Sequence, residues 1–272
     1  MQIADRQGME LINLKITMIL RRLGNKQKLA EKIQEYFPPH KIYIEPFFGA
    51  GGMFFNKPKA KYNIVNDLDS DVFNLFQVVS NNKTEFEEAF YTMPIHTDLL
   101  NYWKSNEETE PIKKALRFLL KSNFTYSGTG TALIFTFADS KGQLMKMLDE
   151  TYKMIYGVQF DNDDFRRFLK KPNFTKGPNF REESFIYCDP PYLNTTDNYS
   201  NSFNETDSVD LFDCLEESEC KFAMSEFDNE FILNQAKERG LNVIIIGERN
   251  NLKNKRTEIL ITNYKNSQAT LF

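Results

Sequence analysis

The chain has 272 residues with 41% hydrophobic and 26% charged residues and a formal net charge of −4 at pH 7. These proportions are ordinary for a globular protein and argue against a disordered or fibrous chain, and no apolar stretch approaches the roughly 20 residues of a membrane helix. Three cysteines and two histidines are too few for a disulfide framework or a structural zinc site, so we expect an intracellular protein without metal.

The first part of the chain has the pattern of a nucleotide-binding sheet. Apolar residues recur with helical spacing over Leu29–Tyr36 and stop before two prolines, which predicts a helix. Lys41–Glu45 and Tyr62–Asn66 are predicted strands, and the glycine-rich turn Phe48–Gly52 lies between them. A helix over Asp71–Ser80 follows. A strand, a glycine turn and a second strand that ends in acidic residues are typical of a doubly wound α/β sheet.

Residues 81–180 lack this alternation of strands and helices. Pro111–Lys121 has the apolar spacing of a buried helix, and Ser122–Gly130 is rich in Ser, Thr and Gly. We therefore expect residues 81–180 to form an inserted, mainly helical subdomain. The core would consist of residues 14–80 and 181–272.

The strand pattern resumes after the insertion. Strands are predicted at Ser184–Cys188, Lys221–Ser225, Val243–Ile246 and Thr257–Thr262, with the last strand closing the sheet. Glu230–Arg239 is a predicted helix that ends before a glycine. The predicted fold is thus an α/β, Rossmann-like sheet that the insertion interrupts.

The strongest motif in the sequence is Asp189-Pro190-Pro191-Tyr192, directly after a predicted strand. The two prolines fix φ and remove backbone donors, so a carboxylate, a rigid carbonyl and an aromatic ring are presented where open α/β sheets bind ligands. These groups suit an exocyclic amine on a flat ring. The alternative is a strand-terminating turn with a helix-capping Asp and a packing Tyr.

A second motif is the segment Glu45–Gly52, which includes Phe47 and the glycine-rich turn. Gly49 and Gly51 allow the backbone to turn tightly beside a ligand. Asp67 lies about twenty residues further on, at the end of the next strand, where an acid can bind ribose hydroxyls. The alternative for Asp67 is an N-cap of the following helix.

Taken in order, these motifs resemble the Dam-type, alpha-group adenine-specific DNA methyltransferases. The resemblance extends along most of the chain. Leu20–Lys26 is similar to the family's L-K-aromatic-x-G-G-K motif, with Lys26 at the position of its last lysine and Arg22 at that of its aromatic residue. Tyr43–Phe55 is similar to the family's V-E-P-F-x-G-A-G-S-V-F.

The resemblance implies methyl transfer from S-adenosylmethionine to the N6 amine of an adenine flipped out of double-stranded DNA. It implies that the catalytic residues are Asp189, Pro190, Pro191 and Tyr192. It implies that the cofactor is bound by Lys26, Glu45, Phe47, Gly49, Gly51, Asp67 and Asp189.

The resemblance also places target recognition in the insertion. Tyr126 lies in a segment similar to the family's recognition loop, although a core aromatic is an equal alternative. Lys253, Lys255 and Arg256 are predicted phosphate contacts, or else belong to a solvated hairpin. A cognate restriction nuclease is a further expected partner, and the cytoplasm of a bacterium, or of a cell infected by its phage, is the expected location.

Two other functions remain open at this point. The same scaffold can act on cytosine N4, on RNA or on a protein amide, because each offers a flat conjugated amine. A non-catalytic nucleotide-binding or DNA-binding relative is the other alternative.

Overall fold

The computed structural model describes residues 19–20, 26, 29–134, 139–171, 180–193, 203–250 and 255–265. Its centre is one seven-stranded sheet with the strand order β3-β2-β1-β4-β5-β7-β6. Strands β1 to β5 pair in parallel, and β7 pairs antiparallel with both β5 and β6. The strands are β1 (Ile42–Glu45), β2 (Tyr62–Asn66), β3 (Gln159–Asp161), β4 (Ser184–Cys188), β5 (Lys221–Phe227), β6 (Asn242–Asn250) and β7 (Lys255–Thr262).

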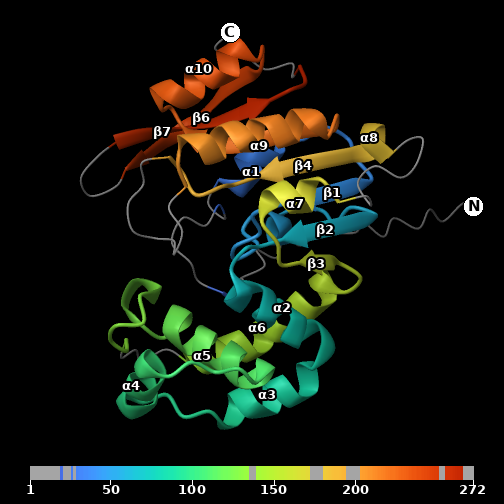
Figure 1. Cartoon of the computed structure of the whole chain (residues 1–272). Coiled ribbons are helices and arrows are strands. Elements are labelled where there is room, and N and C mark those ends of the chain that lie inside the picture. The colour runs from blue at the N-terminus through green and yellow to red at the C-terminus, as the bar shows by residue number, and fades with distance from the viewer. Residues whose placement is uncertain are drawn as a thin grey trace, which may run out of the picture.

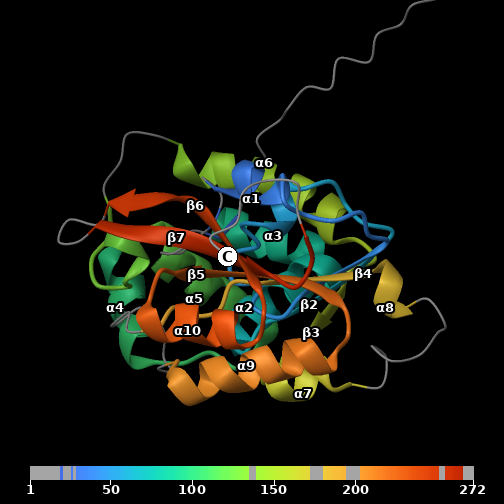
Figure 2. The same cartoon turned by 90° about the horizontal axis from the view of Figure 1, so that it is seen from above.

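Helices cover both faces of this sheet (Figures 1 and 2). Helices α7 (Phe165–Leu169), α9 (Glu205–Glu217) and α10 (Glu230–Glu238) pack on one face, and α1 (Ala30–Gln34) and α2 (Ser70–Asn81) pack in the cluster on the other. The short helix α8 (Phe180–Glu183) leads into β4. Within the described ranges, no helix is both long and apolar enough to cross a membrane.

Side-chain alternation along the strands explains why both faces are covered. Ile42 and Ile44 pack among α7, α9 and α10, whereas Tyr43 packs in the cluster on the opposite face. The same alternation runs along β4, where Tyr187 and Cys188 enter different clusters. Because successive residues of a strand point to opposite faces, two apolar faces require two layers of helices. The predicted doubly wound α/β fold is confirmed.

Four further helices gather beyond the β2–β3 side of the sheet (Figure 1). These are α3 (Lys83–Thr92), α4 (Thr97–Ser105), α5 (Pro111–Asn123) and α6 (Ser140–Ile155). The chain then returns to the sheet earlier than position 180, because β3 pairs with β2 and α7 packs against α9. Residues 159–169, which the sequence pattern assigned to the insertion, therefore contact the core.

The last strand in sequence does not close the sheet. Strand β7 lies between β5 and β6, with Glu258 opposite Phe227 on one side and Gly247 on the other. The edge is instead β6, which has a register shift between Ile245 and Gly247. This arrangement places the beginning of β7, not its end, beside the carboxyl end of β5.

A glycine turn connects β1 to a short 3-10 helix, Phe54–Asn56. Gly49 and Gly51 have φ values of 55° and 72°, in the left-handed region that favours glycine. A Cβ atom on Gly49 would meet nothing within 4 Å, whereas a Cβ on Gly51 would overlap the Phe55 ring. The turn is therefore open to its surroundings at Gly49 and closely packed at Gly51.

This difference predicts unequal costs for alanine at the two glycines. Gly49→Ala should lower the free energy of unfolding by about 1–2 kcal/mol, because only backbone strain is added. Gly51→Ala should lower it by about 1–3 kcal/mol more, because the methyl group also overpacks the core. Urea denaturation of the two variants measures the difference. Equal losses would contradict this account of the turn.

Candidate functional site

The carboxyl ends of the central strands bring together most of the residues that the sequence singled out. Strands β1 and β4 are neighbours, and the chain leaves them in opposite directions across the sheet, which makes this pair the topological switch point. Glu45 is the last residue of β1, and Asp189 directly follows β4. Because β7 is antiparallel to β5, Glu258 near its beginning reaches the same edge.

The first contact at this edge is an ion pair between Asp189 and Lys26. The Lys26 ammonium lies 2.7 Å from Asp189 Oδ1 and 3.2 Å from Glu258 Oε1. Lys26 is only 3% exposed, whereas the Asp189 side chain is 21% exposed. One carboxylate oxygen of Asp189 is thus fixed by a buried cation, and the side chain still reaches the surface.

The ring of Tyr192 is held on several sides. Its hydroxyl donates a hydrogen bond to Glu258 Oε1, and the Lys26 ammonium lies 4.3 Å from the ring centroid. Phe227 makes an edge-to-face contact at 4.6 Å. Tyr192 is only 8% exposed, and burial, followed by the charges of Asp189 and Glu258, raises its pKa well above 10. The phenol therefore remains a hydrogen-bond donor at neutral pH.

The backbone after Tyr192 is held by a second buried carboxyl group. Glu226, in β5, accepts hydrogen bonds from the backbone N–H groups of Leu193 at 3.3 Å and Phe227 at 2.8 Å. Burial raises the pKa of Glu226 to about 8, against the lowering effect of these two bonds. The side chains of Glu226 and Glu258 point to opposite faces of the β5–β7 pair. Glu258 is opposite Phe227 and shares its face, and successive side chains along a strand alternate between the two faces.

Asp67 holds the glycine turn from the end of the next strand. One of its carboxylate oxygens accepts a hydrogen bond from the Gly49 backbone N–H at 2.6 Å, and the other accepts from Asp69 N–H at 2.9 Å. The N-cap of α2 is Asp69, whose side chain accepts from Asp71 N–H. The helix-capping alternative for Asp67 is therefore wrong, and Asp67 lies beside the open part of the turn.

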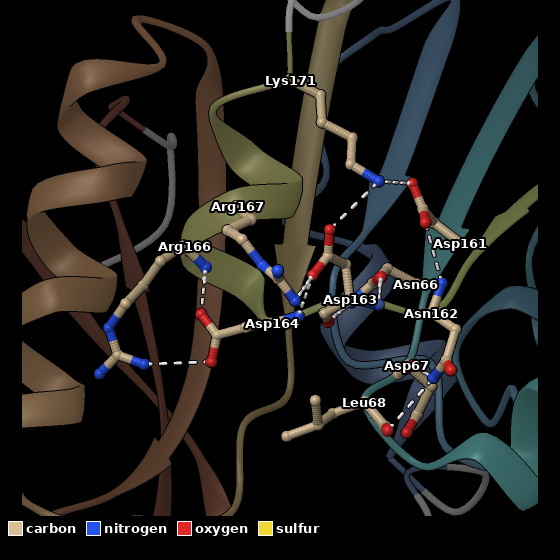
Figure 3. Close-up of polar contacts among 10 residues, drawn as sticks. All are labelled: Asn66, Asp67, Leu68, Asp161, Asn162, Asp163, Asp164, Arg166, Arg167 and Lys171. Atoms are coloured by element: carbon tan, nitrogen blue, oxygen red, sulfur yellow. Dashed lines mark hydrogen bonds and ion pairs between the residues drawn. The ribbon is translucent and has the colours of Figure 1, made fainter.

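Asn162 and Asp163, which follow β3, form hydrogen bonds with the chain around Asp67 (Figure 3). Asn162 donates hydrogen bonds from its side chain to the carbonyls of Asp67 and Leu68, at 2.7 and 3.2 Å. Asn66 and Asp163 exchange two bonds, since Asp163 N–H donates to Asn66 Oδ1 and Asn66 Nδ2 donates to the Asp163 carbonyl. The ends of β2 and β3 are therefore locked to each other.

Ion pairs lie next to these hydrogen bonds between the ends of β2 and β3. Lys171 forms ion pairs with Asp161 and Asp163, and Arg167 pairs with Asp163 (Figure 3). Lys171 and Arg167 therefore neutralise carboxylates close to them in the structure.

Glu45 and Phe47, which precede the glycine turn, have different surroundings. Glu45 is 2% exposed and accepts a hydrogen bond from the Tyr43 hydroxyl at 2.8 Å. Burial is the main reason that its pKa is raised well above 4.5, and the charges of Asp189 and Asp67 add to the shift. The Phe47 ring lies 5.5 Å from Phe165 and 6.2 Å from Phe203.

The expected DNA contacts lie in two places, since Arg256 lies next to this cluster and Tyr126 lies in the helical insertion. Tyr126 is 71% exposed on a short 3-10 turn of the insertion, so the alternative of a core aromatic is wrong. The Arg256 guanidinium lies 5.2 Å from the Phe227 ring centroid. Lys255 begins β7, and Lys253 lies outside the described residues, as do Arg22 and Gly24 of the N-terminal motif.

Two residues of the cluster, Glu226 and Glu258, were not among the predicted site residues. Each carries a carboxyl group inside a strand, next to apolar residues, with exposures of 1% and 0%. Because buried carboxylates are costly unless they are paired, a Glu within a buried strand is the signal that identifies such residues. Among the described residues, no group of three His, Cys, Asp or Glu side chains is arranged to hold a metal ion.

Comparison with known proteins supplies the remaining information. The sequence model of the D12 class N6 adenine-specific DNA methyltransferases matches residues 23–252. The chain is 32% identical over 196 residues to the DNA adenine methylase of Haemophilus influenzae, which is 66% of this chain and 65% of that protein. It is 26% identical over 246 residues to the DNA adenine methylase of Vibrio cholerae, which is 83% of this chain and 79% of that protein.

Solved structures add little to this. An rRNA methyltransferase from Streptomyces viridochromogenes aligns with 93% of this chain and 93% of its own at 8% identity, with a TM-score of 0.42. A likeness at this level says nothing about function.

The raised pKa of Glu226 predicts that the free energy of unfolding of the wild type depends on pH differently from that of a variant without this carboxyl group. Between about pH 4.5 and pH 8 the folded protein keeps a proton on Glu226 that the unfolded chain has released. Stability must therefore fall as pH rises through this range, by at most about 1.4 kcal/mol per pH unit for one proton. Glu226→Gln cannot titrate and should lack this slope.

Urea denaturation at several pH values tests this directly. The free energy of unfolding of the wild type, minus that of Glu226→Gln, should decrease from pH 5 to pH 8 and then level off. Parallel curves for the two proteins would show that Glu226 is ionised throughout.

Proposed function

We propose a site and a set of acting residues for this chain, which belongs to the D12 class N6 adenine-specific DNA methyltransferases. Its activity is accordingly the methylation of adenine N6 in DNA. The observation that carries the assignment of residues is the ion pair between Asp189 and buried Lys26, at the switch point of the sheet. It fixes a partly exposed carboxylate beside the ring of Tyr192.

The residues around the glycine turn fit a methyl donor of the nucleoside class. Open space beside Gly49 allows a ligand to approach the backbone, and the Asp67 carboxylate lies next to it. We propose that this donor is S-adenosylmethionine, which supplies a methyl group on a sulfonium sulfur. Lys26, Glu45, Phe47, Gly49, Gly51, Asp67 and Asp189 would form its binding site, with Asp67 as the ribose contact.

The target adenine would be held at Asp189 and Pro190. The N6 lone pair of adenine is conjugated with the ring, so the amine is a weak nucleophile. Hydrogen bonds from its two N–H groups to the Asp189 carboxylate and the Pro190 carbonyl favour a pyramidal nitrogen and stabilise its developing positive charge. In a direct transfer the bond from N6 to the methyl carbon would form as the S–C bond of the donor breaks, leaving a neutral thioether. The surplus N6 proton would leave along its hydrogen bond to the Asp189 carboxylate, and no covalent bond to the protein is required, only correct positioning.

Lys26 would have a supporting part in this step. Its ammonium holds Oδ1 of Asp189 at 2.7 Å, so the carboxylate cannot rotate freely. Pro190 and Pro191 fix the backbone that follows. The acceptors for the amine are therefore in place before DNA binds, which is the condition for efficient electrostatic stabilisation.

Tyr192 would stack on the flipped base. Extrusion of a base from the duplex costs a few kcal/mol, and stacking on an aromatic ring returns about 1–3 kcal/mol. Since Tyr192 is only 8% exposed and the Phe227 ring packs on it, stacking requires Phe227 to shift when DNA binds. We include this local rearrangement in the proposal.

Target recognition would belong to the helical insertion, whose proposed extent is now residues 81–158. Exposed Tyr126 is its proposed DNA contact, and Lys253, Lys255 and Arg256 would contact phosphates. A cognate restriction nuclease as a partner, and a location in the bacterial cytoplasm, complete the proposal. The bacterial sources of the relatives support the proposed location.

The catalytic assignment predicts that Asp189→Ala abolishes methylation while the protein remains folded. The loss should be at least about 100-fold, because a group that stabilises the transition state is removed. The fold should persist because Lys26 keeps Glu258 as a partner. Base-resolved sequencing of plasmid DNA incubated with protein and S-adenosylmethionine measures the modified atom and the site together.

Asp213→Ala is the matched control, because Asp213 is half exposed and pairs with Arg239 on the protein surface. Such pairs contribute at most about 1 kcal/mol, so its methylation should equal that of the wild type. Normal turnover by Asp189→Ala would refute the proposed mechanism.

The phosphate assignment predicts a uniform loss of DNA affinity when Lys253, Lys255 and Arg256 are changed together to alanine. Because phosphates carry no sequence information, affinity should fall equally for methylatable and unrelated duplexes. The slope of log affinity against log salt should also decrease, by about 0.9 for each phosphate that the variant no longer neutralises. Fluorescence anisotropy with labelled duplexes measures both quantities.

A triple change of Lys41, Lys61 and Lys237 to alanine removes the same charge elsewhere. Lys41 and Lys61 precede β1 and β2, at the opposite edge of the sheet. If both triple variants weaken DNA binding equally, net charge alone explains the effect and the proposed contact is wrong.

A further inference from the structure

We infer that Glu258 is a positioning residue for methyl transfer, which sets the separation between Asp189 and Tyr192 through bonds to Lys26 and the Tyr192 hydroxyl. This inference rests on the proposed function of Asp189 and Tyr192. Glu258 itself contacts neither substrate nor methyl donor in the proposal. It acts through the two residues that it holds.

One oxygen atom makes both contacts. Oε1 of Glu258 lies 3.2 Å from the Lys26 ammonium and accepts the hydrogen bond of the Tyr192 hydroxyl. Lys26 in turn lies 2.7 Å from Asp189 Oδ1 and 4.3 Å from the centroid of the Tyr192 ring. Glu258, Lys26 and Tyr192 therefore contact one another in a closed ring, and Asp189 is joined to this ring through Lys26. Glu258 is the most deeply buried of the four residues.

The strand arrangement fixes Glu258 rigidly. It lies in the interior of β7, between Phe227 of β5 and Gly247 of β6, and is completely buried. Strands pair with it on both sides, so its backbone has little freedom. A rigid, buried carboxylate is a suitable reference point for two side chains that must meet a substrate with sub-ångström accuracy.

The charges explain why this carboxylate matters to Asp189. Lys26 is shared between two carboxylates, so its positive charge is divided between Asp189 at 2.7 Å and Glu258 at 3.2 Å. Without the charge of Glu258, the ammonium would be attracted to Asp189 alone and would compete more strongly with the amine of the base. The Tyr192 ring would also lose the acceptor that fixes its hydroxyl.

Buried charge pairs are a poor source of stability, because desolvation offsets most of the attraction. Glu258 and Lys26 therefore need an explanation other than stability, and fixing the two side chains that would contact the target base provides one. A purely structural role would be expected to affect folding and every binding step alike. A positioning role should affect mainly the methyl-transfer step.

The test is Glu258→Gln, which keeps the size and the acceptor of the side chain but removes its charge. The single-turnover rate of methyl transfer, with saturating S-adenosylmethionine and plasmid DNA, should fall about 10- to 100-fold. The Kd for S-adenosylmethionine, measured by isothermal titration, should stay within about threefold, because Lys26 keeps its ion pair with Asp189 and because Asp67 and the glycine turn are unchanged. Glu238→Gln, on the exposed side of α10, is the control.

A double-mutant cycle with Tyr192→Phe identifies the route. Tyr192→Phe keeps the ring but removes the hydroxyl that Glu258 accepts. If Glu258 acts through this bond, the rate of the double variant should be higher than the product of the two single effects predicts. Tyr192→Phe alone should also reduce the rate, and this keeps the inference testable if Glu258→Gln does not fold.

Three outcomes would overturn the inference. They are a wild-type rate in Glu258→Gln, a loss confined to S-adenosylmethionine affinity, and additive effects in the cycle. If the wild type itself produced no N6-methyladenine, the proposed residues or donor would fail instead. The two failures are therefore distinguishable.

Discussion

The structure depends on one buried ammonium group, that of Lys26, placed between two carboxylates. Asp189 and Glu258 come from parts of the chain that are 69 positions apart (258 − 189), and Lys26 precedes the whole sheet. Two carboxylates around one point would repel each other strongly in a medium of low polarity. The lysine makes their proximity possible, and the ring of Tyr192 is then enclosed against it.

The topology of the sheet explains why these groups meet. Parallel strands β1, β2, β4 and β5 all end at one edge, so Glu45, Asp67, Asp189 and Glu226 converge there without any special loop. Antiparallel β7 contributes from its beginning, which adds Glu258 to the same edge. An all-parallel sheet would have placed Glu258 near the opposite edge. The reversed strand is therefore what supplies the second carboxylate to Lys26.

Much of this could be predicted from the sequence, because apolar patterns and Gly and Pro positions are local signals. The predicted strands Tyr62–Asn66 and Ser184–Cys188 match β2 and β4 residue for residue. Strand β3 was missed because Gln159–Asp161 is short and only partly buried. Glu226 was missed because the predicted strand ended at Ser225, although β5 continues to Phe227. Spatial pairing, such as that between Glu258 and Lys26, leaves no trace in a single sequence.

The insertion is joined to the sheet at both of its ends beside the glycine turn. It leaves through α2, which follows Asp67, and it returns through β3, which precedes Asn162. Asn162 donates to the carbonyls of Asp67 and Leu68, and Asp67 in turn accepts the N–H of Gly49. A displacement of the insertion must therefore pass through bonds that shape the proposed donor site. Because hydrogen-bonded, packed elements resist gradual deformation, DNA bound by the insertion, as proposed, would be coupled through these bonds to a donor bound at the turn.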